Sequence, residues 1–286
     1  MRHVPTLAHP TLPSGWRTDA RALLRLYWEV ARRGYRRYAT YRGAAVAGVF
    51  TNTVFGFLRA YILIALFTSR PHIGGYTVTD ALTYTWLTQG ALMVVYIWGW
   101  YEIAERIRSG DVVSDLQRPV DFQLYWLSQD LGRALFHGIF RGIPPFLLGA
   151  LVFHLFVPHA PTTYLLFVFS LLLAVCISFA LRFIVNVLAF WVMDYRGVAG
   201  LAAVFWTFLS GFAIPLAILP GGWHTVAELL PFAGMVQTPV DIFLQKPHAG
   251  ALLSALGLQL LWAGVLLVAG RLLLRAALRR VVVQGG

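Results

Sequence analysis

The sequence has few charged residues and almost no cysteine. Only 12% of its 286 residues are Asp, Glu, Lys or Arg, whereas 58% are hydrophobic. Soluble domains carry roughly 25% charged residues, so this chain has too little polar surface for water and we expect lipid to surround it. The one cysteine, Cys176, lies in an apolar run, which excludes a disulfide framework and indicates a small buried residue.

Motifs for nucleotide, metal and covalent chemistry are also missing. The single lysine, Lys246, does not lie in a GxxxxGK[ST] motif, so the chain has no P-loop of its own for ATP. The eight histidines lack metal-binding spacings such as HExxH, and no pairing of a nucleophile with a base is evident. The sequence therefore predicts no metal site, no cofactor and no catalytic residue in this chain.

Six apolar runs are long enough for a transmembrane helix, which needs roughly 20 residues. They are residues 44–67, 81–101, 135–157, 164–193, 198–219 and 249–273. A barrel would show short alternating segments instead, so the sequence predicts an all-α membrane protein with six transmembrane helices. The chain then divides into a cytoplasmic N-terminal segment (1–43), a transmembrane domain (44–273) and a cytoplasmic tail (274–286).

The basic residues that give the net charge of +11 are distributed on one side of these runs. Of the 23 Lys and Arg residues, Arg59 and Arg182 lie inside predicted helices, and only Arg70 and Lys246 lie in segments opposite the termini. The positive-inside rule therefore predicts that both termini are cytoplasmic. This distribution accounts for the basic charge without nucleic acid as a partner.

Two segments outside the runs have their own patterns. Residues 20–41 place apolar side chains at helical spacing with arginines between them, which predicts an amphipathic helix in the inner membrane interface. Residues 220–247 are too polar and too rich in Pro and Gly to span, yet they contain apolar pieces. We expect short re-entrant helices in the outer leaflet there, before the last span.

Polar side chains inside the runs are candidates for function. Arg59 and Arg182 could extend towards lipid head groups, or they could face a cavity or a partner helix, and both alternatives remain open. Asn52 and Asn186 lie on the same two helices and could form hydrogen bonds between helices. All four are candidates for the translocation path or for interhelical contacts.

Two glutamates follow the second apolar run. Glu102 and Glu105 could form an acidic pair, or they could pair with Arg106 and Arg108 near the interface. We expect the second arrangement, because neighbouring opposite charges on one helix attract each other.

The loop at 109–126, SGDVVSDLQRPVDFQLYW, is charged and aromatic. Asp111 can cap a short helix at 112–117, and Pro119 ends it. Asp121 can cap a second helix, 122–136, which continues into the third run. We predict two helices around a fixed elbow, a shape suited to docking another protein, although an ordinary interhelical loop would show the same pattern.

Two stretches resemble a known family. Residues 107–133, IRSGDVVSDLQRPVDFQLYWLSQDLGR, are similar to the cytoplasmic loop of type-2 ABC exporter permeases, where an I-x-x-G-x-[IV]…L-x-[RK]-P stretch is common. Residues 197–243 carry that family's SG…IP…P…LPF…P pattern. The resemblance covers nearly the whole chain, from Tyr27 to Arg275, and is nearest to the bacterial viologen or multidrug exporters.

The resemblance implies one transmembrane half of an ATP-driven exporter in the bacterial cytoplasmic membrane. Two halves, identical or different, would form the pathway, and separate ATPase subunits would bind ATP and Mg. The substrate would be a hydrophobic or amphipathic compound, including cations, or a lipid. The residues 27–41 would be the interface helix, and Gly211 and Pro215 would lie near the gate and the dimer surface. The loop would be the coupling helix, contacting the ATPase through Asp111, Val112, Asp115, Leu116, Arg118, Pro119 and Asp121.

Two other classes of protein remain as alternatives. A membrane-embedded enzyme acting on lipid would need polar groups that converge at one depth, and the sequence offers no evident nucleophile for it. An ATP-independent transporter is disfavoured by the absence of inverted repeats and of a conspicuous intramembrane acid.

Overall fold

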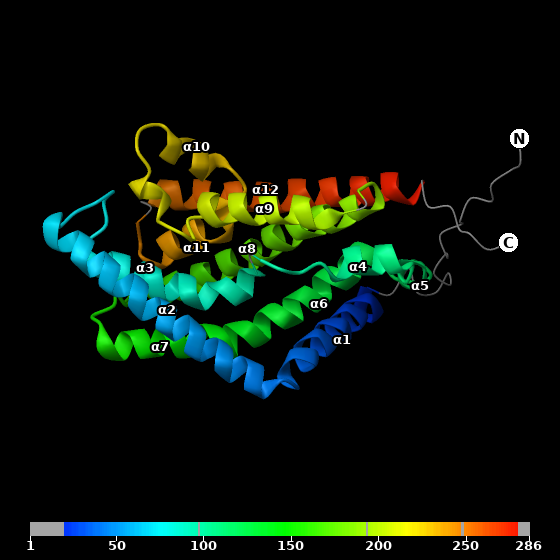
Figure 1. The fold of residues 1–286 in the computed structure, drawn as a ribbon, viewed down its shortest axis with the longest axis horizontal. Coiled ribbons are helices and arrows are strands. Elements are labelled where there is room, and N and C mark those ends of the chain that lie inside the picture. Colours follow the sequence, from blue (N-terminus) through cyan, green and yellow to red (C-terminus); the bar gives the residue numbers. More distant parts are fainter. Residues whose placement is uncertain (1–19, 97, 193, 247–248, 280–286) are drawn as a thin grey trace, which may run out of the picture.

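The structure, a computed structural model, describes residues 20–96, 98–192, 194–246 and 249–279 (Figure 1). Regular structure in these ranges is helical, apart from an isolated bridge between Ile73 and Tyr76. The prediction of an all-α protein is therefore confirmed. The first 19 residues, Met193 at the end of the fourth run and the tail from residue 280 onward lie outside the described residues.

Four of the six apolar runs form helices that are long and apolar enough to cross a membrane. The first is α2 (Arg42–Ser69), and the third is a continuous helix made of α6 (Phe122–His137), the π-helical turn η2 (Gly138–Gly142) and α7 (Ile143–Val152). The fourth is α8 (Pro161–Val187) with the 3-10 turn η3 (Leu188–Phe190). The sixth is α12 (Ala249–Leu278), which continues into the predicted tail.

The other two runs form shorter helices than the sequence predicted. The second run gives α3 (Val78–Ala91) and the π-helical turn η1 (Leu92–Tyr96), and the fifth gives α9 (Tyr195–Leu209). Left-handed backbone ends both: Tyr96 and Gly99 have φ of 57° and 83°, and Gly211 has φ of 84°. A residue with positive φ cannot continue a right-handed helix, so the expected ends at residues 101 and 219 were too far along the chain.

The third run lies earlier in the chain than its predicted limits. Its helix begins at the elbow with Phe122 and ends at Val152, because Phe153 has extended backbone geometry. The expected helix to residue 157 was therefore wrong at its end. The prediction that the elbow helix continues into this run is confirmed.

The central helix of the bundle is α8. Of its most apolar stretch, 44% is buried, against 17–22% for the three other long helices. It contacts α12 and α6 as well as η1 and α9. The outer helices keep many apolar side chains exposed, as expected when lipid is the solvent.

One end of the molecule, which we call the loop end, carries α1 (Ala20–Ala39), α4 (Glu102–Ser109) and α5 (Val112–Leu116) (Figure 1). The predicted N-terminal helix is confirmed as a helix. It turns away from α2 and packs along α6. Two glycines permit the close approach: a Cβ on Gly34 would lie 2.4 Å from the Gln129 carbonyl oxygen, and one on Gly132 would lie 1.8 Å from the Ala31 carbonyl oxygen.

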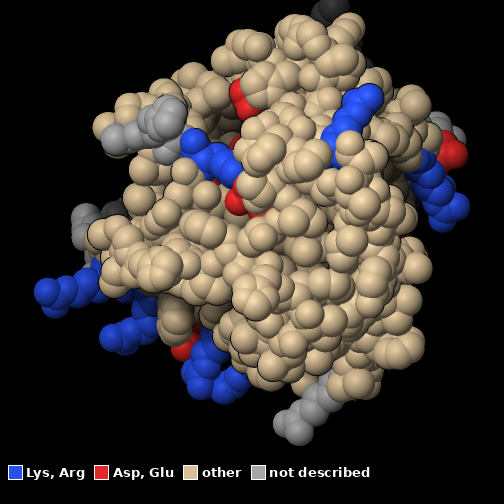
Figure 2. Space-filling view, turned by 90° about the vertical axis from the view of Figure 1, so that its left-hand side faces the viewer, with Lys and Arg blue, Asp and Glu red and all other residues tan. Residues whose placement is uncertain are grey.

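The opposite end, which we call the far end, carries the 70–77 segment and the short helices between α9 and α12. These are η4 (Leu216–Ile218), α10 (Trp223–Leu229), η5 (Ala233–Met235) and α11 (Gln237–Phe243). The prediction of short helices in 220–247 is confirmed. Figure 2 looks onto this end and shows a largely uncharged surface with charged side chains in a few places.

We expect the substitution Gly132→Ala to destabilise the packing of α1 on α6. The added Cβ would meet the backbone of α1, which cannot move without shifting the helix, and overpacking of this kind costs about 1–3 kcal/mol. Thermal unfolding of the purified chain in detergent should show a lower midpoint. The control is Gly257→Ala in α12, where a Cβ meets nothing within 4 Å; an equal loss in both variants would contradict the close-packing role.

Candidate functional site

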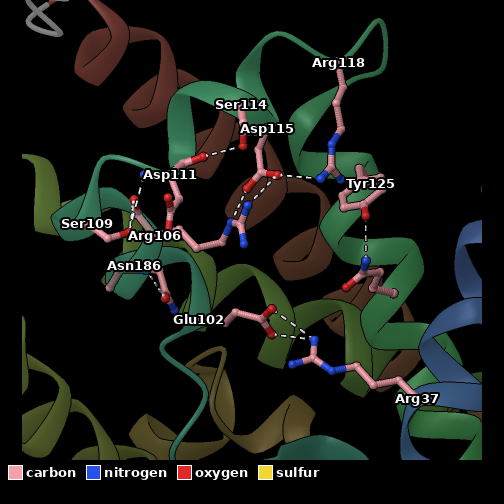
Figure 3. Close-up of polar contacts among 12 residues, drawn as sticks. Arg37, Glu102, Arg106, Ser109, Asp111, Ser114, Asp115, Arg118, Tyr125 and Asn186 are labelled. Carbon is pink, nitrogen blue, oxygen red and sulfur yellow. Dashed lines mark hydrogen bonds and ion pairs between the residues drawn. The ribbon is translucent and has the colours of Figure 1, made fainter. Parts of the chain in front are cut away.

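The loop at 109–126 is a compact turn held by its own side chains (Figure 3). Gly110 ends α4 with φ of 84°, and α5 follows at once. Asp121 caps α6 as predicted, since its Oδ1 accepts a hydrogen bond of 2.9 Å from the Leu124 amide. Asp111 precedes α5 but makes no side-chain cap: its carboxylate accepts from the Ser109 hydroxyl at 2.7 Å. The capping role predicted for Asp111 was therefore wrong.

Asp115 is the centre of this turn. Its carboxylate accepts hydrogen bonds from Arg106 of α4, one of them 3.0 Å long from Nη2, and lies 2.9 Å from Nη2 of Arg118 (Figure 3). The hydrogen bond to Asp115 raises the pKa of Arg106. Arg118 also lies 4.9 Å over the ring of Tyr125 on α6. One buried carboxylate thus fixes α4, α5 and the elbow relative to one another.

The seven predicted contact residues divide by exposure. Val112 and Asp115 are buried, and their side chains therefore support the loop instead of presenting a surface. Leu116 is half-buried. Four are exposed, and their contact with an ATPase stays a prediction: Asp111, Arg118, Pro119 and Asp121. Exposed Ser114 and Gln117, which the sequence prediction omitted, lie on the same turn.

Three contacts join this turn to the rest of the chain. Glu102 pairs with Arg37 at the end of α1, with 2.9 Å between Oε2 and Nη1, instead of with the expected Arg106 or Arg108. Asn186 of α8 accepts from the Ala104 amide at 2.9 Å and donates to the Trp100 carbonyl at 3.0 Å. Its predicted interhelical role is confirmed. A shift of α4 must therefore act on α1 and α8.

An open groove of about 500 Å³ lies beside α4. Its walls combine aromatic side chains with both signs of charge. The lining residues are Arg37, Gly99, Trp100, Tyr101, Glu102, Glu105, Arg106, Ser109 and Asp111.

A buried charged cluster lies where α6 and α8 meet. Asp130 accepts from Arg133 Nε at 2.7 Å and from Arg182 Nη2 at 2.7 Å, and all three side chains are 1% exposed. Arg182 also packs 5.1 Å over the ring of Trp100. Of the two alternatives left open for Arg182, contact with a partner helix is therefore correct, and extension towards head groups is wrong.

The sequence prediction missed Asp130 and Arg133 as members of this cluster. Arg133 donates to the carbonyls of Met93 and Val94, the second at 2.9 Å, and Ser178 donates to the carbonyl of Val95. These carbonyls belong to η1, where the second run ends, so they lack partners in a continuing helix. The available signal was an Asp and an Arg three residues apart in an otherwise apolar helix.

The first helix carries the other predicted polar residues. Asn52 donates to the Gln89 carbonyl of α3 at 3.2 Å, which confirms an interhelical contact. Arg59 donates to the carbonyls of Phe212 and Ala213, the second at 2.7 Å, just beyond the end of α9. It therefore binds a partner segment instead of lipid head groups.

Gln237 of α11 stabilises the turn that follows the end of α9. Gln237 Oε1 accepts from the Leu216 amide at 2.9 Å, and the Tyr84 hydroxyl lies 2.7 Å from both Oε1 and the Gly211 carbonyl. Burial raises the pKa of the neighbouring Asp241 to about 6. Gly211 and Pro215 are buried by this packing. Their place near a gate and near a dimer surface stays a prediction.

In the part of the chain that the structure describes, no three His, Cys, Asp or Glu residues are grouped as metal ligands. Arg59, Asp130, Arg133 and Arg182 are engaged with one another or with backbone carbonyls, which indicates a structural role for these four side chains.

We expect Asp115→Asn to loosen the loop. The change leaves two arginines facing a neutral amide, and the loss of a hydrogen bond to a charged group costs about 1.5–3 kcal/mol. We expect the lower end of this range, because both arginines are part-exposed. Hydrogen exchange of residues 109–121 should become faster. The exposed Ser114→Ala serves as control, and unchanged exchange in Asp115→Asn would contradict the bracing role.

We expect Asp130→Asn to be the more damaging change. It would leave two buried guanidinium groups without an anion, and breaking a buried pair costs about 3–5 kcal/mol. The yield of folded protein and the unfolding midpoint should both fall. The double variant Asp130→Asn, Arg182→Gln should recover part of the loss; a double variant worse than the sum of both single changes would contradict the pairing.

Comparisons with known proteins agree with this architecture. A family model described as ABC-2 family transporter protein matches residues 54–285. The searches of curated proteins and of solved structures found no match. ABC-2 permeases are transporter components that are not themselves catalytic and generally work with an ATPase partner. The match covers most of the sequence, including the loop, the buried cluster, three of the four spanning-length helices in full and α2 from residue 54 onward. The chain therefore belongs to the ABC-2 transporter family, as a multi-pass membrane permease component of an ABC transporter.

Proposed function

We propose that the chain is the permease half of an ATP-driven exporter in a bacterial cytoplasmic membrane, and that α5 and the elbow at 117–121 seat in a groove of a separate ATPase subunit. The observation that carries the proposal is the loop itself. It is exposed at its tip, yet Asp115 braces it from inside with two arginines. A rigid projection can pass a push from a partner to the bundle, whereas a flexible loop would absorb it.

The topology we propose has six crossings with both termini on the cytoplasmic side. The segments α3 and η1 have 14 and 5 residues, about 28 Å at 1.5 Å per residue, close to the hydrocarbon thickness. The 15 residues of α9 reach about 22 Å, and the chain continues beyond them to η4. The sparse charge on the far end supports an outward orientation for it (Figure 2).

The push would reach the membrane helices by three routes. ATP and Mg, bound by the ATPase, would drive closure of that subunit's dimer against α5. Asp115 would pass the movement to α4, Asn186 would pass it to α8, and the Glu102–Arg37 pair would pass it to α1. The elbow would act on α6 directly, because α6 begins there.

The proposed assembly pairs this permease with a second, identical or homologous copy. Its α9 exposes a row of large apolar side chains, including Leu201, Phe205 and Phe208, that a second copy or lipid would cover. We assign it to the viologen or multidrug exporters on the pattern of its loop and of residues 197–243. The substrate would be a hydrophobic or amphipathic compound, including cations, or a lipid.

A bulky residue on the exposed tip tests the docking. We expect Ser114→Trp to leave the chain inserted in the membrane and to lower the amount of co-purifying ATPase about tenfold, since it obstructs seating of α5; tenfold corresponds to about 1.4 kcal/mol. The measurement is a pull-down of the tagged chain from mild detergent, with efflux assayed in parallel. The matched control is Ser69→Trp, also exposed but at the far end.

Equal ATPase recovery with Ser114→Trp and with wild type would contradict docking through α5. Recovery of the wild-type chain alone, even after crosslinking, would contradict the exporter proposal. The hypotheses to test would then be a lipid-processing enzyme and an ATP-independent transporter.

A further inference from the structure

Arg141 lies within a membrane helix and has no hydrogen-bond or ion-pair partner among the residues that the structure describes. It lies in η2, inside the apolar helix that runs from Phe122 to Val152. Its Nε is buried without a hydrogen-bond partner in the described chain. None of the ion pairs made by the described carboxylates includes Arg141. This is the state in which a charged side chain in lipid is most costly.

His137, one turn before Arg141, is also without a partner. Its side chain is 4% exposed, and both ring nitrogens are buried with no hydrogen-bond partner among the described residues. Residues four apart lie on one face of a helix, so the two side chains share a face. A neutral imidazole carries one N–H donor. The face therefore offers a guanidinium and an imidazole donor with no acceptor from the chain.

The helix that carries Arg141 and His137 has no free carboxylate of its own to balance this face. Asp130 is the only acidic residue between Phe122 and Val152, and its carboxylate is already shared by Arg133 and Arg182. Buried polar groups are normally satisfied by a partner. The described residues therefore leave Arg141 without an acceptor, which a group from outside the chain can supply.

The position of Arg141 fits the head-group level of the leaflet at the loop end. η2 packs against α2, and the Arg141 guanidinium lies directly on Gly48 of α2. Gly48 is six residues from the start of α2 at Arg42, or about 9 Å along the axis. Both elements also carry exposed apolar side chains, such as Phe50 on α2 and Phe140 on η2, as expected for helices that face lipid. A guanidinium there can reach a phosphate at the interface.

We infer that Arg141 binds the phosphate group of a membrane phospholipid at the seam between α2 and η2. The guanidinium would donate to phosphate oxygens, a charge-assisted contact in which arginine geometry is favourable. The acyl chains would lie along the exposed apolar side chains of the seam. This site does not depend on the ATPase contact, because η2 is remote from α5 along α6 (Figure 1).

Native mass spectrometry of the full-length chain, delipidated in detergent and titrated with phosphatidylglycerol, tests the site. We expect Arg141→Gln to lower the affinity for the first bound lipid about tenfold, through loss of a charge-assisted hydrogen bond; tenfold corresponds to about 1.4 kcal/mol. Gly48→Ala should weaken binding as well, since its Cβ would lie 2.1 Å from Arg141 Nη2 and displace the guanidinium while leaving every charge in place. That second variant decides the question if Arg141→Gln fails to fold.

The matched control is Arg275→Gln, an exposed arginine in the last turn of α12 at the same end of the molecule. It should bind lipid like the wild type. Equal binding by wild type and Arg141→Gln, or equal binding of diacylglycerol, which has no phosphate, would overturn the proposal. Displacement of the lipid by millimolar inorganic phosphate would assign the site to a free anion and would also overturn it.

Discussion

The fold depends on one buried carboxylate. Asp130 lies on the longest apolar helix and pairs with both Arg133 of its own helix and Arg182 of the central helix α8. Through Arg133 it also fixes the carbonyls at the end of η1. A helix end inside a membrane is possible only when its free carbonyls have donors. The second run can therefore stop at Tyr96 because the cluster supplies those donors, and the chain can then turn towards α4.

This arrangement places the rigid core next to the exposed loop. Asp130 follows the start of α6 by eight residues, about 12 Å along the helix. The same helix is capped by Asp121 at the elbow and is packed against α1 through two glycines. Glu102 and Asn186 attach α4 to α1 and α8. The loop end is thus a set of helices joined by charge pairs and amide hydrogen bonds, which suits transmission of a displacement.

The polar side chains in the apolar region fall into two groups, which differ in whether they have a partner within the described chain. Arg59, Asn52 and the Asp130 cluster bind neighbouring segments of the same chain, so they stabilise breaks and crossings within the bundle. Arg141 and His137 have no such partner in the described residues. The contrast matters because a satisfied charge contributes to the fold, whereas an unsatisfied one indicates a contact with something outside the chain.

The sequence by itself determined the helical membrane class, the existence of the four long helices and the helix–elbow–helix form of the loop. Long apolar runs, a proline and a capping aspartate are local signals, and they act through nearest neighbours. The tertiary structure alone decided where the second and fifth runs stop, since positive φ at Tyr96 and Gly211 depends on contacts from α6, α8 and α11. It also decided which oppositely charged side chains pair. Glu102 pairs with Arg37 instead of with the arginines on its own helix, and Asp130 pairs with Arg182, which is 52 residues away in the sequence. A charged side chain pairs with the opposite charge that packing brings close to it in the low-dielectric interior. The separation of two residues along the sequence does not give the distance between them in space.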